Sequence, residues 1–273
     1  MGSERSKLQQ NENDSKNTRM NLTDSMRLMD FRKDELMHIA RYFKACETAV
    51  SLSKKLGRPI RMLDLGCGEI YSIRLFYKSF LVKKSEVIKQ YIGLDIDKPM
   101  LDRVKQDYFG VLEKMNGKLV AQDITTNPKL KLKDDSVDLI VWFEMVEHIK
   151  PEFVEPIMKE TLRVLNPEGT MLLSTPNSNG SNKKLPKDHV YEWSYEDLKD
   201  LITKSGFNIE YAKGVCINPS RIPQNVMKSR EREIEAVYRT FGKNTAYSCV
   251  ALAPLFPVKY SKNMLFKLRK GNE

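Results

Sequence analysis

Short apolar runs alternate with helical stretches through the middle of this 273-residue chain. The runs are rich in Ile, Leu and Val and are bounded by polar residues, a pattern typical of buried strands. We expect strands over 61–65, 92–95, 118–122, 137–143 and 170–175, and helices over 69–80, 99–115 and 151–165. Strands that alternate with helices predict a Rossmann-like, doubly wound α/β fold, in which helices cover both faces of a parallel sheet.

The pattern changes after the fifth predicted strand. Met264, Phe266 and Leu268 recur at every second position, which predicts a final edge strand. Together with one further strand, this brings the predicted sheet to seven strands. Between residue 176 and the C-terminus we expect a polar loop over 177–187, a helix over 195–205, a strand over 207–216 and mostly helix over 224–253.

The residues before the first strand divide into a polar tail and a helical segment. Residues 1–18 contain almost no large apolar side chain, so we expect them to be disordered. From Thr23, a suitable N-cap, apolar residues recur at helical spacing, Phe43 among them, and predict two helices that end near Gly57. The predicted plan is a tail over 1–18, a helical segment over 19–57 and one domain over 58–273.

The first predicted strand runs into a loop with glycine at alternate positions. Gly66 and Gly68 lack a Cβ and can adopt positive φ, so this loop can approach a ligand closely. Asp95 ends the next strand, where a parallel sheet binds the ribose hydroxyls of a nucleoside. Tyr71 replaces the third glycine of a dinucleotide fingerprint, and Glu69 would repel a pyrophosphate. The pattern therefore favours a cationic nucleoside over NAD.

Several motifs resemble, in family order, those of the class I S-adenosylmethionine-dependent methyltransferases. They are Asp-Leu-Gly-Cys-Gly-Glu at 64–69, Gly-Leu-Asp-Ile-Asp at 93–97, Gln-Asp-Ile at 122–124, and Leu-Asn-Pro-Glu-Gly-Thr followed by Leu-Leu-Ser-Thr-Pro-Asn over 165–177. The resemblance covers roughly residues 58–217. It implies S-adenosylmethionine as the cofactor and an antiparallel last strand. It also implies that the helices over 19–57 cover the cofactor as a lid, with simple packing against the sheet edge as the alternative.

The resemblance also assigns cofactor contacts residue by residue. The residues expected at the methionine end and on the ribose are Asp64, Gly66, Gly68 and Asp95. The residues expected around adenine are Asp123, which would accept from the amino group, and Ile96 and Ile124, which would flank the ring. The predicted set is completed by Cys67, Glu69, Gln122 and Phe143. Asp123 has an alternative role as a helix cap.

Acidic residues and histidines gather after the fourth predicted strand. Glu144, Glu147 and His148 lie within five residues, and His189 follows the fifth strand at the same edge of the sheet. These segments resemble the small-RNA 3′-terminal 2′-O-methyltransferases. That resemblance implies that all four side chains bind a divalent metal, Mn²⁺ or Mg²⁺, and that Glu144, His148 and His189 serve catalysis. A metal that binds the 2′ and 3′ oxygens would activate a ribose hydroxyl.

Alternatives to this interpretation remain open. A neutral histidine acts as a base without any metal in many reactions, or simply shapes a pocket. The acceptor would then be a small molecule such as a quinone, a sugar or another metabolite. A third alternative is a catalytically idle fold that serves as a binding subunit, although the intact Asp64, Asp95 and Asp123 argue against it.

Charge and cysteine content suggest a partner and a compartment. The net charge is +10, and residues 221–273 contain 11 Lys or Arg but 4 Asp or Glu, which predicts a nucleic-acid partner or, alternatively, a solvated basic surface. No apolar run approaches the roughly 20 residues of a membrane span, and the polar N-terminus is no secretory signal. The four cysteines show no paired spacing, as expected in a reducing compartment. We expect a soluble cytoplasmic protein; the oligomeric state is not predicted.

Overall fold

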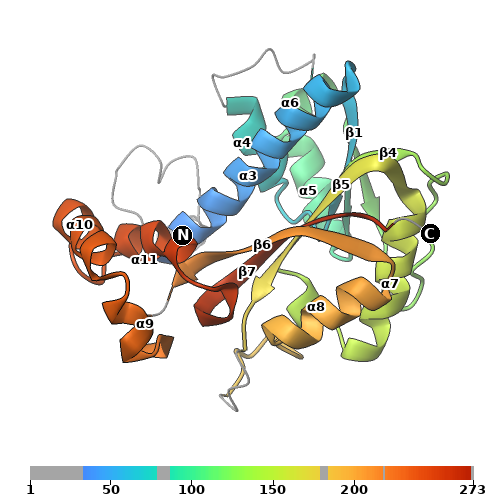
Figure 1. Ribbon diagram of the computed structural model, residues 1–273. Coiled ribbons are helices and arrows are strands. Elements are labelled where there is room, and N and C mark those ends of the chain that lie inside the picture. The colour runs from blue at the N-terminus through green and yellow to red at the C-terminus, as the bar shows by residue number, and fades with distance from the viewer. Residues whose placement is uncertain (1–32, 79–86, 179–183, 218, 272–273) are drawn as a thin grey trace, which may run out of the picture.

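The computed structural model describes residues 33–78, 87–178, 184–217 and 219–271, which form a seven-stranded sheet with surrounding helices (Figure 1). The strands are β1 Ile60–Leu65, β2 Ile88–Asp95, β3 Lys118–Ala121, β4 Val137–Phe143, β5 Leu165–Pro176, β6 Phe207–Ile217 and β7 Ser261–Lys270. Their order across the sheet is β3-β2-β1-β4-β5-β7-β6. Strands β1 to β5 pair in parallel, and β7 is antiparallel to both β5 and β6. The predicted Rossmann-like α/β fold with an antiparallel last strand is confirmed.

Strand β7 does not lie at the edge of the sheet, so the prediction of a final edge strand is wrong in its position. It pairs with β5 on one side and with β6 on the other. Both backbone edges of β7 are therefore hydrogen-bonded, and Met264, Phe266 and Leu268 are buried. The edge strand at this end of the sheet is β6, whose middle residues are only partly buried or exposed. Alternating apolar residues reveal which face of a strand is buried but not which strands lie beside it.

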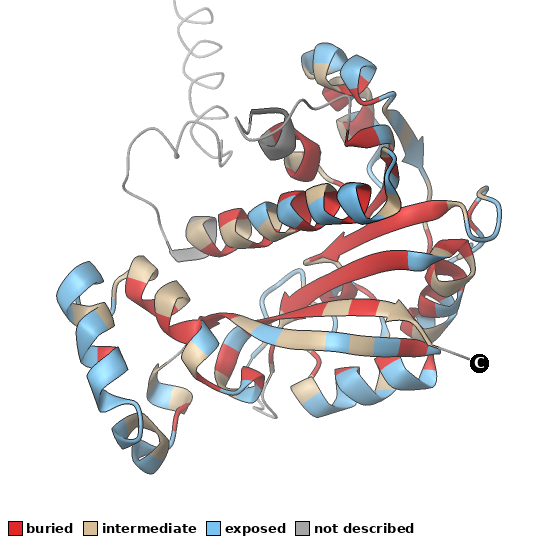
Figure 2. Ribbon diagram, turned by 45° about the horizontal axis from the view of Figure 1, so that its top comes forward, coloured by how far each residue is buried: buried red, intermediate tan, exposed pale blue. Residues whose placement is uncertain are grey.

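Helices pack on both faces of the sheet (Figures 1 and 2). In the described residues they are α3 Lys33–Leu56, α4 Tyr71–Lys78, α5 Lys98–Asp107, α6 Phe109–Lys114, α7 Pro151–Val164, α8 Tyr195–Lys204, α9 Gln224–Lys228, α10 Glu231–Phe241 and α11 Ala246–Leu252. The predicted helix over 99–115 is divided at Tyr108, which ends α5 and begins α6. Asp97 caps α5 by accepting a hydrogen bond from the Met100 N–H at 2.9 Å.

Two hydrophobic clusters, one on each face, hold these layers together. Strand β4 is buried along its whole length, and its side chains alternate between the clusters. Leu139 and Val141 face the cluster beneath α3 and α5, whereas Ile140 and Trp142 face the cluster beneath α7 and α8. Burial on both faces explains why β4 appears in the sequence as a continuous apolar run.

The N-terminal segment is described only from residue 33. One long helix, α3, occupies the second half of the predicted helical segment and ends before Gly57, whose φ is +62°. The predicted disordered tail over 1–18 and the predicted N-cap at Thr23 lie outside the described residues. Helix α3 packs on α4 and crosses the face of the sheet beside β4 and β5 (Figure 2).

A helical insertion separates β6 from β7. Helices α9, α10 and α11 project from the end of the sheet (Figure 1), where a small cluster of Ile217, Ile222, Ile234, Leu252 and Phe256 joins them to β6. This agrees with the mostly helical pattern predicted over 224–253. None of the helices in the described ranges has the length and apolar character needed to cross a membrane.

Candidate active site

The crevice between the carboxyl ends of β1 and β4 is where the strand order reverses, the usual ligand site of such sheets. The loop after β1 is fixed there by hydrogen bonds to β2. The Gly66 N–H donates to the Leu94 carbonyl at 2.8 Å, and the Gly68 N–H donates to Asp95 Oδ2 at 3.0 Å. Gly66 and Gly68 have φ values of +67° and +48°. A Cβ on Gly66 would lie 2.7 Å from Met145 Sδ, so the loop leaves no room for a side chain there.

Asp64 lies beneath this loop and is 4% exposed. Its carboxylate accepts hydrogen bonds from the hydroxyls of Ser72 and Tyr91, the second at 2.9 Å. Burial raises the pKa of Asp64 to about 6, although both hydroxyl donors act in the opposite direction. Cys67 is also buried, and its burial raises the thiol pKa above the ordinary range. The structure therefore places both residues where they shape the loop from within.

Glu69 lies at the rim of the loop and is paired with a cation. Its Oε2 lies 3.4 Å from Arg74 Nη1 and accepts a hydrogen bond from the Tyr71 hydroxyl at 3.3 Å. The Arg74 guanidinium in turn lies over the rings of Tyr71 and Tyr108, 4.9 and 4.1 Å from their centroids. Because Arg74 balances its charge, Glu69 is weaker evidence against a pyrophosphate than the sequence suggested. The stronger evidence against a dinucleotide is that Tyr71 replaces the third glycine of the fingerprint.

Asp95 and Ile96 follow β2 beside the loop. The two carboxylate oxygens of Asp95 accept hydrogen bonds from the Gly68 N–H and the Asp97 N–H, each at 3.0 Å. A carboxylate oxygen accepts more than one hydrogen bond, so Asp95 retains the acceptor capacity that a ribose diol needs. Ile96 is 67% exposed and presents apolar surface on which an aromatic ring can lie.

The residues after β3 take local structural roles. The Gln122 side chain donates to two backbone carbonyls of the following loop, at 2.7 and 3.0 Å. Asp123 Oδ1 accepts from both the N–H and the hydroxyl of Thr125, at 2.9 and 2.7 Å, and these bonds lower the Asp123 pKa. Ile124 is buried in the core. Asp123 thus caps a turn, which leaves its predicted contact with adenine a prediction.

Glu144 follows β4 and is held by three other elements. Its φ of +49° is strained for a residue with a side chain. Its Oε1 accepts from Ser174 Oγ on β5 at 2.9 Å, and its Oε2 accepts from Asn263 Nδ2 on β7 at 2.8 Å. The Arg41 guanidinium of α3, 1% exposed, lies 3.5 Å from Oε1. The Glu144 carboxylate is therefore neutralised by a cation of the chain.

Helix α3 also contributes an aromatic ring to the crevice. Tyr42 packs between Phe143 and Tyr71, with ring centroids 5.8 and 6.0 Å away. Phe143 is 6% exposed at the end of β4. Through Arg41 and Tyr42, helix α3 therefore contacts residues that follow β1 and β4. Its predicted role as a lid stays a prediction.

Three of the four predicted metal ligands lie together. One ligand atom from each of Glu147, His148 and His189 lies within 4.8 Å of the other two. The two imidazoles meet edge to face with centroids 5.1 Å apart. The backbone carbonyl of Glu147 accepts hydrogen bonds from the N–H groups of Val190 and Tyr191, at 2.8 and 3.1 Å. These bonds draw the loop that carries His189 onto the turn that carries His148.

Hydrogen bonds fix the protonated nitrogen of each histidine. His148 Nδ1 lies 2.7 Å from the Asp188 carbonyl oxygen, which can only accept, so Nδ1 carries the proton. His189 Nδ1 lies 2.8 Å from Glu192 Oε1, a carboxylate acceptor with the same consequence. In the neutral form of each imidazole, Nε2 is then the unprotonated nitrogen, which is the one that can bind a metal. A hydrogen-bond acceptor on the other nitrogen is typical of metal-binding histidines.

Glu147 has no cation of its own among the described residues. It is 1% exposed and accepts a hydrogen bond from the Thr175 hydroxyl at 3.0 Å. Burial and the negative charge of Glu144 raise the Glu147 pKa well above its usual range, and Arg41 offsets only part of this effect. A bound cation would relieve both causes. One carboxylate and two imidazoles are a donor set that fits Mn²⁺ and related metals better than Mg²⁺.

Comparison of the chain with protein families shows to which family it belongs. A family model described as a methyltransferase domain matches residues 38–212, more than half of the chain. The chain belongs to this methyltransferase family. The predictions of the class I family and of an enzyme of this class are therefore confirmed, and S-adenosylmethionine is the cofactor that membership implies.

Curated relatives of the methyltransferase match only in part. A probable S-adenosylmethionine-dependent methyltransferase of Mycolicibacterium smegmatis is 33% identical over 160 residues, which cover 56% of this chain and 54% of that protein. A small RNA 2′-O-methyltransferase of Xenopus tropicalis is 27% identical over 220 residues, which cover 67% and 56%. This chain thus spans about half the length of these relatives. The methyltransferase domain of bacterial CtHen1-C shares the fold, with a TM-score of 0.54 at 15% identity over 85% of this chain and 100% of that one.

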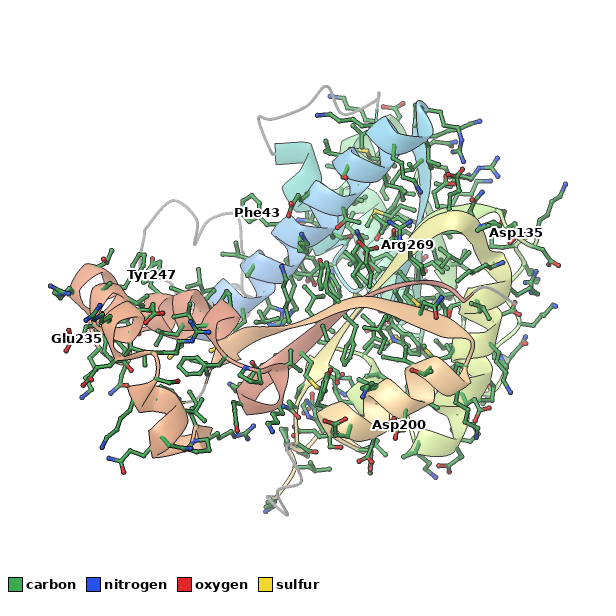
Figure 3. All side chains as sticks on the ribbon, viewed as in Figure 1. Phe43, Asp135, Asp200, Glu235, Tyr247 and Arg269 are labelled. Atoms are coloured by element: carbon green, nitrogen blue, oxygen red, sulfur yellow. The ribbon has the colours of Figure 1, made fainter. Side chains whose placement is uncertain are left out.

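The residues of this methyltransferase fit its implied cofactor at the crevice. The close approach at Gly66, the acceptor capacity of Asp95 and the exposed Ile96 would suit the nucleoside part of this cofactor. Arg41, Tyr42, Ser174 and Asn263 also belong to this site, but the sequence did not reveal them. Tyr42 and Asn263 are polar residues without a motif, and the motif that contains Ser174 does not indicate its contact with Glu144. Arg41 lies in a helical pattern whose apolar positions include Phe43, yet Phe43 points outward and is 41% exposed (Figure 3).

Proposed function

We propose that this methyltransferase transfers the methyl group of S-adenosylmethionine to a ribose 2′-hydroxyl at the 3′ end of an RNA, with a divalent metal held by Glu147, His148 and His189. The observation that carries the proposal is the convergence of a buried carboxylate with two histidines that both have Nδ1 occupied by an acceptor. The name of the Xenopus relative supports the RNA acceptor.

The chain's own residues account for the positioning that methyl transfer requires. Transfer from a sulfonium is an in-line displacement, so its rate depends on how the acceptor oxygen is held against the methyl group. Glu147 and the two histidines lie after β4 and β5, across the crevice from the Gly66 loop. A divalent metal bound there supplies a Lewis acid that lowers the pKa of a ribose hydroxyl. Glu144 is the fourth predicted ligand and is held by Ser174, Asn263 and Arg41.

The test measures methyl transfer from labelled S-adenosylmethionine to a small RNA that ends in a 2′,3′-diol. The control RNA differs only in a 2′-deoxy 3′ end. We expect label in the first RNA alone, stimulated by Mn²⁺ and abolished by chelator. Methylation of the 2′-hydroxyl also protects that end from periodate, which identifies the modified atom. Label confined to a small-molecule extract, or transfer that ignores the chelator, would contradict the proposal.

Variants separate the metal site from the cofactor site. Glu147→Gln and His189→Ala should each lose Mn²⁺ binding and transfer while S-adenosylhomocysteine binding stays unchanged. Asp188→Asn is a matched control, because this exposed residue contacts His148 only through its backbone carbonyl. It removes an acid from the same loop and should leave both activities intact. Equal loss in Asp188→Asn would show that loop charge matters rather than the ligand set.

A further inference from the structure

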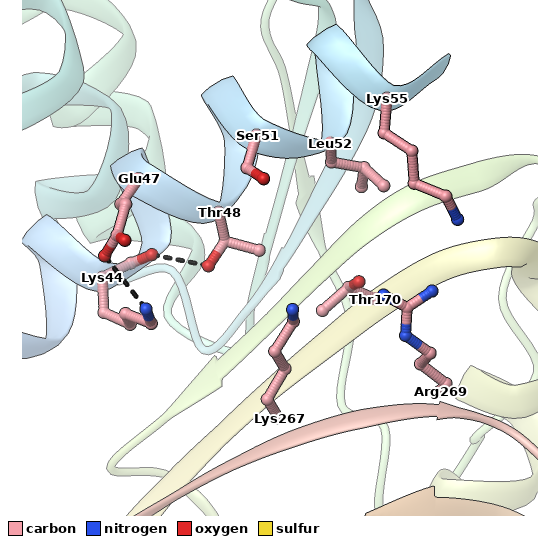
Figure 4. Close-up of a pocket in the computed structure, with 9 residues that line it drawn as sticks. All are labelled: Lys44, Glu47, Thr48, Ser51, Leu52, Lys55, Thr170, Lys267 and Arg269. Atoms are coloured by element: carbon pink, nitrogen blue, oxygen red, sulfur yellow. Dashed lines mark hydrogen bonds and ion pairs between the residues drawn. The ribbon is translucent and has the colours of Figure 1, made fainter. Parts of the chain in front are cut away.

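A polar groove lies between α3 and the strands β5 and β7. Its volume is about 150 Å³. The residues that line it are Lys44, Glu47, Thr48, Ser51, Leu52 and Lys55 of α3, Thr170 of β5, and Lys267 and Arg269 of β7 (Figure 4). We call it the α3–β7 groove. The charged ends of Lys267 and Arg269 point from β7 toward α3 (Figure 4), so cations line both walls.

The cations of the α3–β7 groove outnumber the acids that pair with them. Glu210 alone balances both Lys267 and Arg269, at 2.8 and 2.6 Å. Lys44 pairs with Glu47 at 3.0 Å and Lys55 pairs with Glu168 at 3.5 Å, and these two acids are 70% and 64% exposed. Pairs with such exposed carboxylates contribute about 0–1 kcal/mol each. An anion that brings several negative charges can therefore displace these carboxylates at little cost.

An aromatic ring on β6 adds to the positive charge beside the groove. The Tyr211 ring has three ammonium groups around it, those of Lys44, Lys213 and Lys267, at 5.5, 4.7 and 5.9 Å from its centroid. Attraction to the ring face holds these flexible side chains near one another. Because the ammonium groups cover the ring, it concentrates charge here and is not free to stack on a base.

Two rows of residues connect the groove with the acidic site. On β7, Asn263, Lys267 and Arg269 lie on one face of the strand, and Asn263 binds Glu144. On α3, Arg41, Lys44 and Lys55 follow one helical stripe, and Arg41 lies beside Glu144. Both rows thus begin at Glu144 and continue along the groove. At about 3.3 Å per strand residue, Lys267 and Arg269 lie about 13 and 20 Å from Asn263.

We propose that the α3–β7 groove binds the phosphate backbone of the RNA acceptor, about 13–20 Å along β7 from Asn263, which adjoins the acidic site. This inference rests on the proposed function. From Lys44 to Lys55 the helix rises about 17 Å, which is longer than one phosphate group and suits a linear polyanion. The lining residues contact backbone rather than bases, so the groove contributes affinity without sequence preference.

The test compares two fluorescent RNAs with the same 3′ end, one of about ten nucleotides that spans the groove and one dinucleotide that does not. Binding is followed by anisotropy with S-adenosylhomocysteine and Mn²⁺ present. Lys267→Gln/Arg269→Gln should bind the longer RNA about tenfold more weakly and reduce the slope of log K against log salt by about 1–2. Its affinities for the dinucleotide and for S-adenosylhomocysteine should not change.

Two further variants control for charge and folding. Lys199→Gln/Lys204→Gln removes the same charge from α8 on the opposite face of the sheet and should bind both RNAs as the parent does. Glu47→Lys replaces an exposed acid at the rim and should tighten binding of the longer RNA, an effect that misfolding cannot imitate. Equal binding of the longer RNA by the parent, Lys267→Gln/Arg269→Gln and Glu47→Lys would overturn the inference.

The remaining outcomes separate this inference from the proposed function. If the RNA is methylated but the groove variants act as the parent does, only the groove assignment fails. If neither the parent nor any variant binds or methylates RNA, the proposed function itself is contradicted. Calorimetric titration with inorganic phosphate tests a free anion as the occupant. Phosphate that binds the parent but not Lys267→Gln/Arg269→Gln, without any effect of RNA length, would replace the RNA assignment.

Discussion

Replacing Gly66 by alanine should lower the stability of this methyltransferase. The same replacement at two other glycines shows how much of the loss comes from backbone strain and how much from steric collision. Gly66, Gly68 and Gly57 all have positive φ, at +67°, +48° and +62°. A Cβ on Gly68 or Gly57 would meet no atom within 4 Å. A Cβ on Gly66 would lie 2.7, 3.0 and 3.1 Å from Met145 Sδ, Cγ and Cβ. The three positions therefore share the backbone cost, and Gly66 alone adds a collision.

The magnitudes follow from these two contributions. A left-handed backbone costs an L-residue about 1–2 kcal/mol relative to glycine. An extra carbon forced into packed space costs a further 1–3 kcal/mol or so. We expect Gly68→Ala and Gly57→Ala to lower the free energy of unfolding by about 1–2 kcal/mol, and Gly66→Ala by about 2–5 kcal/mol. The additional loss in the free energy of unfolding for Gly66→Ala measures the cost of the collision with Met145.

Denaturant unfolding of the three variants measures these differences directly. Met145→Ala in the Gly66→Ala background should recover part of the excess, because Sδ and Cγ are removed while the Met145 Cβ at 3.1 Å remains. Calorimetry with S-adenosylhomocysteine should show weaker binding for Gly66→Ala and unchanged binding for Gly57→Ala, which lies at the far end of α3. A Gly66→Ala protein no less stable than Gly57→Ala would refute the reasoning.

Two other predictions concern buried charges. The Asp64 pKa is about 6 in the folded protein and near its ordinary value of 3.8 in the unfolded chain. Between about pH 4 and 6 the folded state therefore binds more protons than the unfolded state. The free energy of unfolding should therefore fall by up to about 3 kcal/mol as pH rises through this window, and Asp64→Asn should remove that dependence in denaturant titrations. Arg41→Gln should lower stability by about 3 kcal/mol, because Glu144 loses its buried partner. It should also bind Mn²⁺ up to about tenfold more tightly, or about 1.4 kcal/mol, since Glu144 becomes available. Unchanged or weaker Mn²⁺ affinity would count against that competition.

The sequence predicted those parts of the fold that depend on local composition. Val137–Phe143 is a continuous apolar run because both faces of β4 are buried, and the run alone reveals this. The alternate glycines at 66 and 68 predicted positive φ, which both residues adopt. The order of strands and helices then restricts the topology to a few choices. These features are properties of short segments, so a single sequence is enough to show them.

The edge shared by the loops after β4 and β5 was enough to predict that His148 and His189 lie close together, but other contacts between distant residues were not predicted. Strand β7 lies between β5 and β6 because the chain returns after an insertion, and alternation carries no record of that pairing. Arg41 is buried although a charged residue in a helix is normally expected at the surface. Its burial depends on Glu144, more than 100 residues later, which it neutralises. No spacing rule within α3 reveals such a contact.

The two glutamates after β4 show how similar residues acquire different chemistry. In sequence, Glu144 and Glu147 look equivalent, three residues apart in one acidic motif. In the structure, Glu144 has a guanidinium and two hydrogen-bond donors, whereas Glu147 has a hydroxyl and two neighbouring imidazoles. A metal ion held by His148 and His189 would therefore meet Glu147 first, because Glu147 has no cationic partner among the described residues. Glu144 would join such a metal by giving up its ion pair with Arg41, so we predict that α3 affects how many carboxylates bind the metal.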